Sequence, residues 1–152
     1  MSLGSSTNWD QISAIATILG VIGGLVSVVF LILEVRRNAK AIEGATVQSL
    51  MTYEHAVYAL LIDHAADFLA GGTDRDGLSA EARFRFDRLV QAYMSLFYSA
   101  FKQYEQGLID PDVWTAYRNS LQAKMALPGF AASWHATSAA YPKPFQALVA
   151  AG

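Results

Sequence analysis

The residues from Gln11 to Leu33 form an uninterrupted run of 23 residues without a charged side chain. As an α-helix this run would be about 34 Å long, enough to cross a hydrocarbon core of roughly 30 Å. A helix of a soluble domain is usually shorter and keeps a polar stripe on one side. The sequence therefore predicts one transmembrane helix over residues 11–33.

The composition of the whole chain agrees with this prediction. Charged residues make up 16% of the 152 residues, below the roughly 25% of soluble domains. The net charge of −2 gives no basic field that would attract nucleic acid. The chain contains no cysteine, which excludes disulfides, thiolate metal sites and cysteine nucleophiles. Residues 34–152 suffice for one domain.

A cleaved signal peptide is the main alternative explanation of an apolar N-terminal run. The first ten residues contain no Lys or Arg, although a signal peptide begins with a basic segment, and the apolar run is longer than the usual 7–15 residues. We therefore expect residues 1–10 to be an extracytoplasmic tail, 11–33 the membrane span and 34–152 a cytoplasmic domain. Whether the opening MSLGSS comes from a tag is left open.

The distribution of basic residues predicts the orientation in the membrane. All 11 Lys and Arg residues follow Leu33, and Arg36, Arg37 and Lys40 come directly after the run. By the positive-inside rule, the N-terminus lies outside and the C-terminal domain lies in the cytoplasm. Trp9 and these three basic residues are expected to anchor the helix at the two membrane interfaces.

Small residues recur along one side of the expected span. Ala16, Gly20 and Gly24 are spaced by four residues, with Gly23 and Ser27 on the adjoining edge. Such small-xxx-small spacing lets two helix backbones approach closely within a bilayer. We interpret these five residues as a helix-association face, while glycine is also simply common in membrane helices.

The remainder of the chain shows helical periodicity and no alternation of period two, which predicts an all-α fold. From Glu34 to Ala70 there is no proline and one glycine, so the span is expected to continue into a long helix that ends at Gly71-Gly72. Together with this helix, the later segments predict a three- to four-helix antiparallel bundle. These segments are 80–106 after the N-cap Ser79, 111–127 after the N-cap Asp110, a short helix at 130–139, and one or two turns at 145–149.

The order of these elements resembles that of small uncharacterised bacterial single-span membrane proteins. The matching motifs are Trp9-Asp10-x-Ile12, Ala14-Ile15-Ala16, Glu34-Val35-Arg36-Arg37-Asn38, the aromatic series from Tyr93 to Asp110, Trp114, Pro128-Gly129 and Trp134. The resemblance implies the same topology and a bacterial inner membrane as the location. It implies no activity and no catalytic residue.

No pattern of catalytic or metal-binding residues stands out. His55 and His64 are nine residues apart on one expected helix, and no Glu-x-x-His pair provides a metal site in a bundle. Ser133 and His135 lack a positioned acid and a nucleophile elbow. We therefore expect no catalytic residue, no metal and no cofactor. The aromatic series Tyr93, Phe97, Tyr98, Phe101 and Tyr104 is expected to form the core, with a pocket for a hydrophobic ligand as the alternative.

These expectations favour a non-enzymatic, membrane-anchored protein that self-associates or serves as a scaffold or accessory subunit. Its expected partners are the lipid bilayer and either further copies of itself or another membrane protein. One alternative is an oligomeric channel lined by Ser13, Thr17, Gly20, Gly24 and Ser27. The other is a membrane-tethered sensor or enzyme for a hydrophobic ligand.

Overall fold

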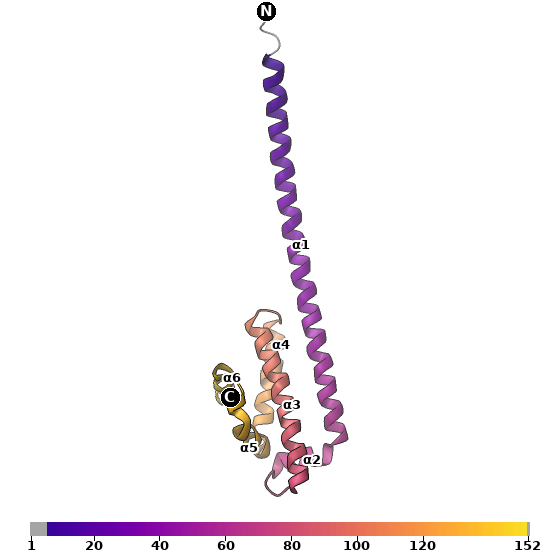
Figure 1. Ribbon diagram of the computed structural model, residues 1–152, viewed down its shortest axis with the longest axis vertical. Helices are drawn as coiled ribbons and strands as arrows, with labels where there is room; N and C mark the ends of the chain where they lie inside the picture. Colours follow the sequence, from indigo (N-terminus) through magenta and orange to yellow (C-terminus); the bar gives the residue numbers. More distant parts are fainter. Residues whose placement is uncertain (1–5, 152) are drawn as a thin grey trace, which may run out of the picture. The chain divides into compact units, whose positions relative to one another are not determined.

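The computed structural model describes residues 6–151, and its ribbon is all-α, with six α-helices and no strand within that range (Figure 1). Residues 1–5 of the expected tail lie outside the described residues. The chain divides into one unit that ends at Ile42 and a second unit that begins at Glu43. The helices are α1 Ser6–Asp63, α2 Ala65–Thr73, α3 Ala80–Glu105, α4 Pro111–Met125, α5 Pro128–Thr137 and α6 Lys143–Ala150, with a 3₁₀ turn at Ser138–Ala140.

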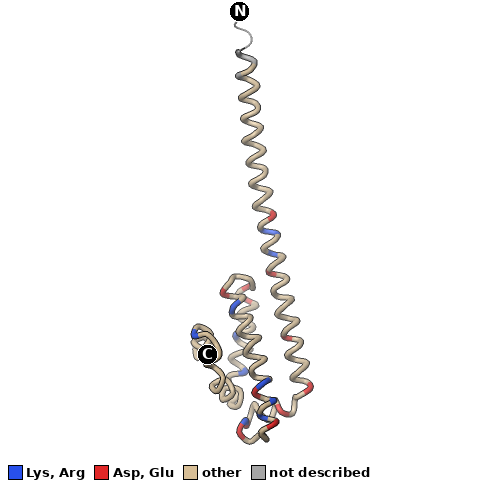
Figure 2. The backbone as a smooth tube through the Cα atoms, viewed as in Figure 1, with Lys and Arg blue, Asp and Glu red and all other residues tan. Residues whose placement is uncertain are grey.

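The first unit contains the apolar part of α1. Every residue from Gln11 to Ile42 is exposed, including large apolar side chains such as Leu19 at 63% and Phe30 at 65%. No Lys, Arg, Asp or Glu lies between residues 11 and 33 (Figure 2). By length and composition, α1 is the one helix among the described residues that is long and apolar enough to cross a membrane.

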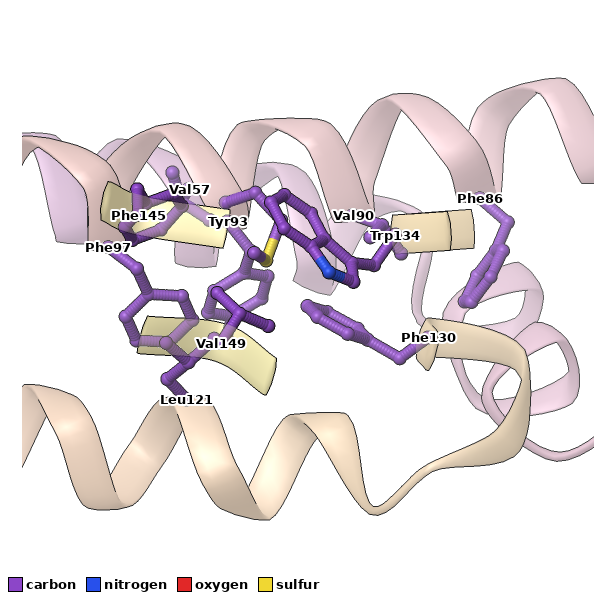
Figure 3. Packing of buried hydrophobic residues seen from close by; sticks show 11 residues of the cluster. Val57, Phe86, Val90, Tyr93, Phe97, Leu121, Phe130, Trp134, Phe145 and Val149 are labelled. Carbon is purple, nitrogen blue, oxygen red and sulfur yellow. The ribbon is translucent and has the colours of Figure 1, made fainter. Parts of the chain in front are cut away.

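The core of the second unit is built on α3. Phe86, Val90, Tyr93 and Phe97 follow one another at helical spacing along α3, and each is at most 3% exposed. Side chains from four other helices pack on this face (Figure 3). They are Val57 of α1, Leu121 of α4, Phe130 and Trp134 of α5, and Phe145 and Val149 of α6. A second buried cluster joins Leu50 of α1, Leu96 and Ala100 of α3, Ile109 of the α3–α4 connection and Trp114 of α4.

The expected helix boundaries of α3 and α4 are confirmed. The Ser79 hydroxyl accepts a hydrogen bond from the Ala82 backbone N–H at 3.2 Å, and the Asp110 carboxylate accepts one from the Asp112 N–H at 2.8 Å. Both side chains satisfy backbone donors that the first turn leaves without partners. Gly107 follows α3 with a φ of 68°, a left-handed conformation that glycine adopts without steric cost.

The first long helix ends earlier than expected. The periodicity predicted a helix up to Ala70, but α1 ends at Asp63, and His64 has φ −123° and ψ 31° before α2 begins. The interruption lets Phe68 pack against Phe86 and Tyr93, with both ring centroids 6.0 Å away. Packing of the core therefore outweighs the local preference for an unbroken helix.

The short helix expected at 130–139 begins two residues earlier than predicted. Pro128 occupies the first turn of α5, which runs from Pro128 to Thr137, and α4 ends before it at Met125. Proline is well suited to this position because its missing N–H would have no partner there. Gly129 and Gly71 bring the backbones of α5 and α2 together. A methyl group added at Gly129 would overlap the carbonyl oxygen of Gly71, and one at Gly71 would overlap the ring of Phe86.

We predict that Gly129→Ala destabilises the second unit by about 3 kcal/mol, since the added methyl collides with backbone rather than with a flexible side chain. The measurement is chemical denaturation of the full chain, followed by far-ultraviolet circular dichroism. Gly44→Ala is the matched control, because a methyl there meets no atom within 4 Å. It should leave stability unchanged or raise it by up to about 1 kcal/mol. Equal effects of the two substitutions would contradict the close helix approach.

Candidate ligand site

The second unit contains a cavity of about 270 Å³ between α1, α3 and α4. Its walls are largely apolar, and one carboxylate, Glu54, lines it. The lining residues are Val47, Leu50, Met51, Glu54 and Tyr58 of α1, Tyr93, Leu96 and Phe97 of α3, and Val113, Ala116, Tyr117 and Ser120 of α4.

Two tyrosine hydroxyls hold the Glu54 carboxylate in place. Tyr58 lies one turn further along α1 and donates a hydrogen bond to Oε1 at 3.0 Å. Tyr117 reaches across from α4 and donates to Oε2 at 3.1 Å. Each carboxylate oxygen therefore has one phenol donor and keeps a further lone pair for another partner.

The negative charge of Glu54 has no cationic partner in the described part of the chain. The ion pairs among residues 6–151 do not include Glu54, and no Lys, Arg or His lines the cavity. Because the residue is half-buried, water screens this charge less than it would screen a fully exposed one. The cavity thus combines apolar walls with a single uncompensated negative charge.

The tyrosines of the cavity remain protonated at neutral pH. Burial raises the pKa of the Tyr117 hydroxyl, and the neighbouring Glu54 charge raises it further. Burial likewise raises the pKa of Tyr93, with smaller contributions from Tyr58 and Glu54. The pKa of Tyr58 is also raised, by burial and by its hydrogen bond to Glu54. The phenols of Tyr58 and Tyr117 consequently act as fixed hydrogen-bond donors to Glu54 over the physiological pH range.

Aromatic rings form one wall of the cavity. Tyr58 meets Tyr93 edge-to-face, with centroids 6.3 Å apart, and Tyr93 stacks on Phe97 at 5.9 Å. The ammonium group of Lys124 lies 5.4 Å from the Tyr93 ring centroid and 5.6 Å from that of Phe68. Lys124 is not among the lining residues, but its position is that of a cation–π contact with a ring of the cavity wall.

The residues predicted to mediate helix association all lie on the exposed part of α1. Cβ atoms placed on Gly20, Gly23 and Gly24 would meet no atom within 4 Å, so this side of the helix is open. Ala16 and Ser27 are exposed, and the Ser27 hydroxyl donates to the Gly23 carbonyl at 2.8 Å. The predicted interface anchors Trp9, Arg36, Arg37 and Lys40 are exposed as well. Both sets remain predictions.

The histidines do not assemble a catalytic or metal site in the described part of the chain. His55, His64 and His135 are exposed, and the described residues contain no group of three His, Asp or Glu side chains placed to hold a metal ion. Ser133 is 1% exposed, whereas His135 is on the surface, so the two do not form a nucleophile–base pair.

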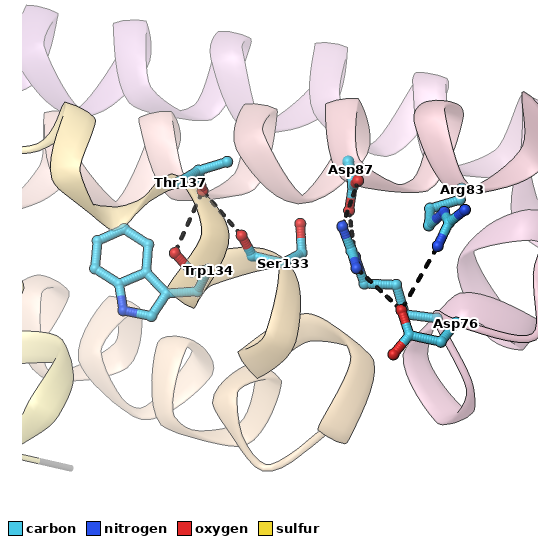
Figure 4. Close-up of polar contacts among 7 residues, drawn as sticks. Asp76, Arg83, Asp87, Ser133, Trp134 and Thr137 are labelled. Carbon is cyan, nitrogen blue, oxygen red and sulfur yellow. Dashed lines mark hydrogen bonds and ion pairs between the residues drawn. The ribbon is translucent and has the colours of Figure 1, made fainter. Parts of the chain in front are cut away.

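A second polar cluster lies where the α2–α3 turn meets α3 and α5 (Figure 4). Arg75 donates two hydrogen bonds to the Asp87 carboxylate, from Nε at 2.8 Å and from an Nη at 2.9 Å. Burial alone would raise the pKa of Asp87, but the hydrogen bonds from Arg75, together with the positive charge of Arg83, lower it below the usual value. We interpret this pair as structural, because it joins the turn to α3 and does not line the cavity.

Sequence reasoning missed Glu54 and Tyr117 as partners. Glu54 and Tyr58 are four residues apart, and such a pair on one helix is visible in the sequence. Tyr117 is 63 residues from Glu54, and no local pattern in the sequence links the two. The aromatic series was expected to form the core. Tyr93 and Phe97 are indeed buried, yet both also line the cavity.

No protein-family model matches this chain, and neither a curated protein nor a solved structure matches it.

We predict that Asp87→Asn lowers the free energy of unfolding at pH 7 by about 2 kcal/mol, because it leaves the partly buried Arg75 without its anionic partner. A lowered pKa in the folded state means that this stabilisation is present at neutral pH and is lost as the pH falls below about 4. Acid should therefore destabilise the wild type more than the variant. Denaturation midpoints between pH 7 and pH 2.5 measure this difference.

The control for this prediction is the exposed pair of Lys102 and Glu105, whose side chains are 45% and 39% exposed. Glu105→Gln should cost less than about 0.5 kcal/mol, because exposed ion pairs contribute little. If Asp87→Asn and Glu105→Gln had the same small effect at pH 7, the structural role of the Arg75–Asp87 pair would be wrong.

Proposed function

We propose that this chain is a non-enzymatic, membrane-anchored helical protein that self-associates, or serves as a scaffold or accessory subunit, through its N-terminal helix. The observation that carries the proposal is the exposure of every residue from 11 to 33 in a segment without a charge. Large apolar surfaces of this kind are unfavourable in water, and they are matched by lipid or by a protein partner.

In this proposal, residues 11–33 cross a bacterial inner membrane, and residues 34–152 form a cytoplasmic domain whose helices make a three- to four-helix antiparallel bundle. The basic residues Arg36, Arg37 and Lys40, which directly follow the span, support this orientation. The resemblance to small single-span membrane proteins supports the same topology. Homo-oligomers are proposed as the main assembly, because the small-residue side of the span is open along its length.

The cavity beside Glu54 favours a second candidate function, the binding of a hydrophobic ligand by the membrane-tethered domain. Small-molecule sites are typically concave and apolar, with a few polar groups that fix the orientation of the ligand. The 270 Å³ cavity lies near the lower limit of such sites. The two proposals are compatible, because they involve different parts of the chain.

We predict that the double variant Gly20→Leu/Gly24→Leu dissociates an oligomer that the wild type forms in mild detergent. Leucine at these positions prevents the close backbone approach on which small-residue helix packing depends. The masses of the two proteins in detergent, measured by light scattering, test this directly.

The matched control is Ile18→Phe/Val29→Phe. At about 100° per residue, positions 18 and 29 lie at least about 120° around the helix from Gly20 and Gly24. This variant adds bulk to the other side of the helix and should keep the wild-type mass. A monomeric wild type without a co-purifying partner would overturn self-association through the span.

We also predict the orientation, which the absence of cysteine makes simple to measure. Thr7→Cys should react with a membrane-impermeant maleimide in intact bacterial spheroplasts, because the N-terminus is outside. Ala132→Cys, at an exposed position of α5, should react only after lysis. The reverse labelling pattern would overturn the orientation, and recovery of the protein in the soluble fraction would overturn the membrane anchor.

A further inference from the structure

We propose that the cavity beside Glu54 binds a small amphiphilic amine, with its positively charged nitrogen at the Glu54 carboxylate and its apolar body between α1, α3 and α4. This inference rests on the second candidate function, ligand binding by the C-terminal unit. It does not depend on self-association of the N-terminal helix.

The charge of the cavity selects a cation. Glu54 is the only charged residue of the lining, and no cationic side chain in the described residues pairs with it. The hydrogen bonds from Tyr58 and Tyr117 fix both carboxylate oxygens and leave a lone pair on each. An ammonium group supplies both the missing charge and the N–H donors, whereas an anionic ligand would be repelled.

The aromatic rings of the cavity wall also favour a cationic ligand. The rings of Tyr58, Tyr93 and Phe97 border the same space as Glu54, and the faces of aromatic rings attract cations. The protein itself uses this interaction nearby, where the Lys124 ammonium lies 5.4 Å from the Tyr93 ring centroid. A ligand amine at Glu54 would thus meet a carboxylate and aromatic rings together.

The size of the cavity limits the ligand. A volume of about 270 Å³ equals the liquid volume of about nine water molecules at roughly 30 Å³ each. This space suits an apolar body on the order of ten non-hydrogen atoms and is far too small for a diacyl lipid. Val47, Leu50 and Leu96 add aliphatic side chains to the lining. The occupant is therefore a small free amine.

Three small ligands of nearly equal size are used to separate the contribution of the head-group charge to binding from that of the apolar body. They are 4-phenylbutylamine, 4-phenylbutanol and 4-phenylbutyrate, each a phenyl ring on a chain of four carbons, and they differ in the head group. Binding is measured by isothermal titration calorimetry at pH 7 with the full chain in dodecyl maltoside, a detergent without charge or amine. The detergent chain competes with all three probes alike, so the comparison between them reports on the head group.

We expect the amine to bind the wild type at least tenfold more tightly than the alcohol, and the butyrate to show no binding. Glu54→Gln should weaken amine binding at least tenfold, and a far-ultraviolet circular dichroism spectrum and denaturation midpoint like those of the wild type show that this variant remains folded. Ala116→Trp, which fills the cavity from an exposed position of α4, should abolish binding of both the amine and the alcohol. Ala123→Trp adds the same side chain to an exposed α4 position outside the lining and should bind like the wild type.

Equal affinity of the wild type for amine and alcohol, or an unchanged amine affinity in Glu54→Gln, would overturn the amine as ligand while leaving a hydrophobic site intact. Amine and alcohol binding that persists in Ala116→Trp would show that the probes enter the micelle or another site, which overturns the cavity as the binding site. Absence of binding by every probe would overturn both the amine and ligand binding by this unit. None of these results would alter the oligomer mass that tests the main proposal.

Discussion

The apolar face of α3 is the constraint on which the rest of the second unit depends. Phe86, Val90, Tyr93 and Phe97 are buried at successive turns, and side chains from α1, α4, α5 and α6 all converge on them. At the Phe86 end the packing is tightest, since Gly71 has no room for a methyl group beside that ring. Next to Tyr93 and Phe97 the packing opens into the cavity between α1, α3 and α4. One face of α3 therefore contributes both to the closely packed end of this unit and to the wall of its cavity.

The local signals in the sequence predicted most of the fold because they act over a few residues. Ser79 and Asp110 cap their helices as expected, and Gly107 ends α3 in the left-handed conformation. The predictions that were wrong concern helix ends whose position depends on contacts with residues distant in the sequence. The interruption at His64 lets Phe68 contact Phe86 across a turn, and Gly129 of α5 fits directly against the backbone at Gly71. Neither contact leaves a signal in local periodicity.

The candidate site was less predictable for the same reason. A carboxylate and a phenol at positions 54 and 58 are a common surface pair on a helix, and nothing local distinguishes them as part of a cavity. The deciding contact comes from Tyr117, on a helix that is brought next to α1 only by the shared packing on α3. Aromatic residues at helical spacing predict a core, and here the same rings serve as core on one side and cavity wall on the other.

The polarity of the cavity argues against a purely structural role for Glu54. This chain has 11 Lys and Arg residues, and it pairs Asp67 and Asp87 with Arg85 and Arg75 at the partly buried end of the unit. Glu54 receives two neutral phenols instead, which orient the carboxylate and leave its charge in place. In a binding site that is otherwise apolar, a few such polar groups fix the orientation of the ligand.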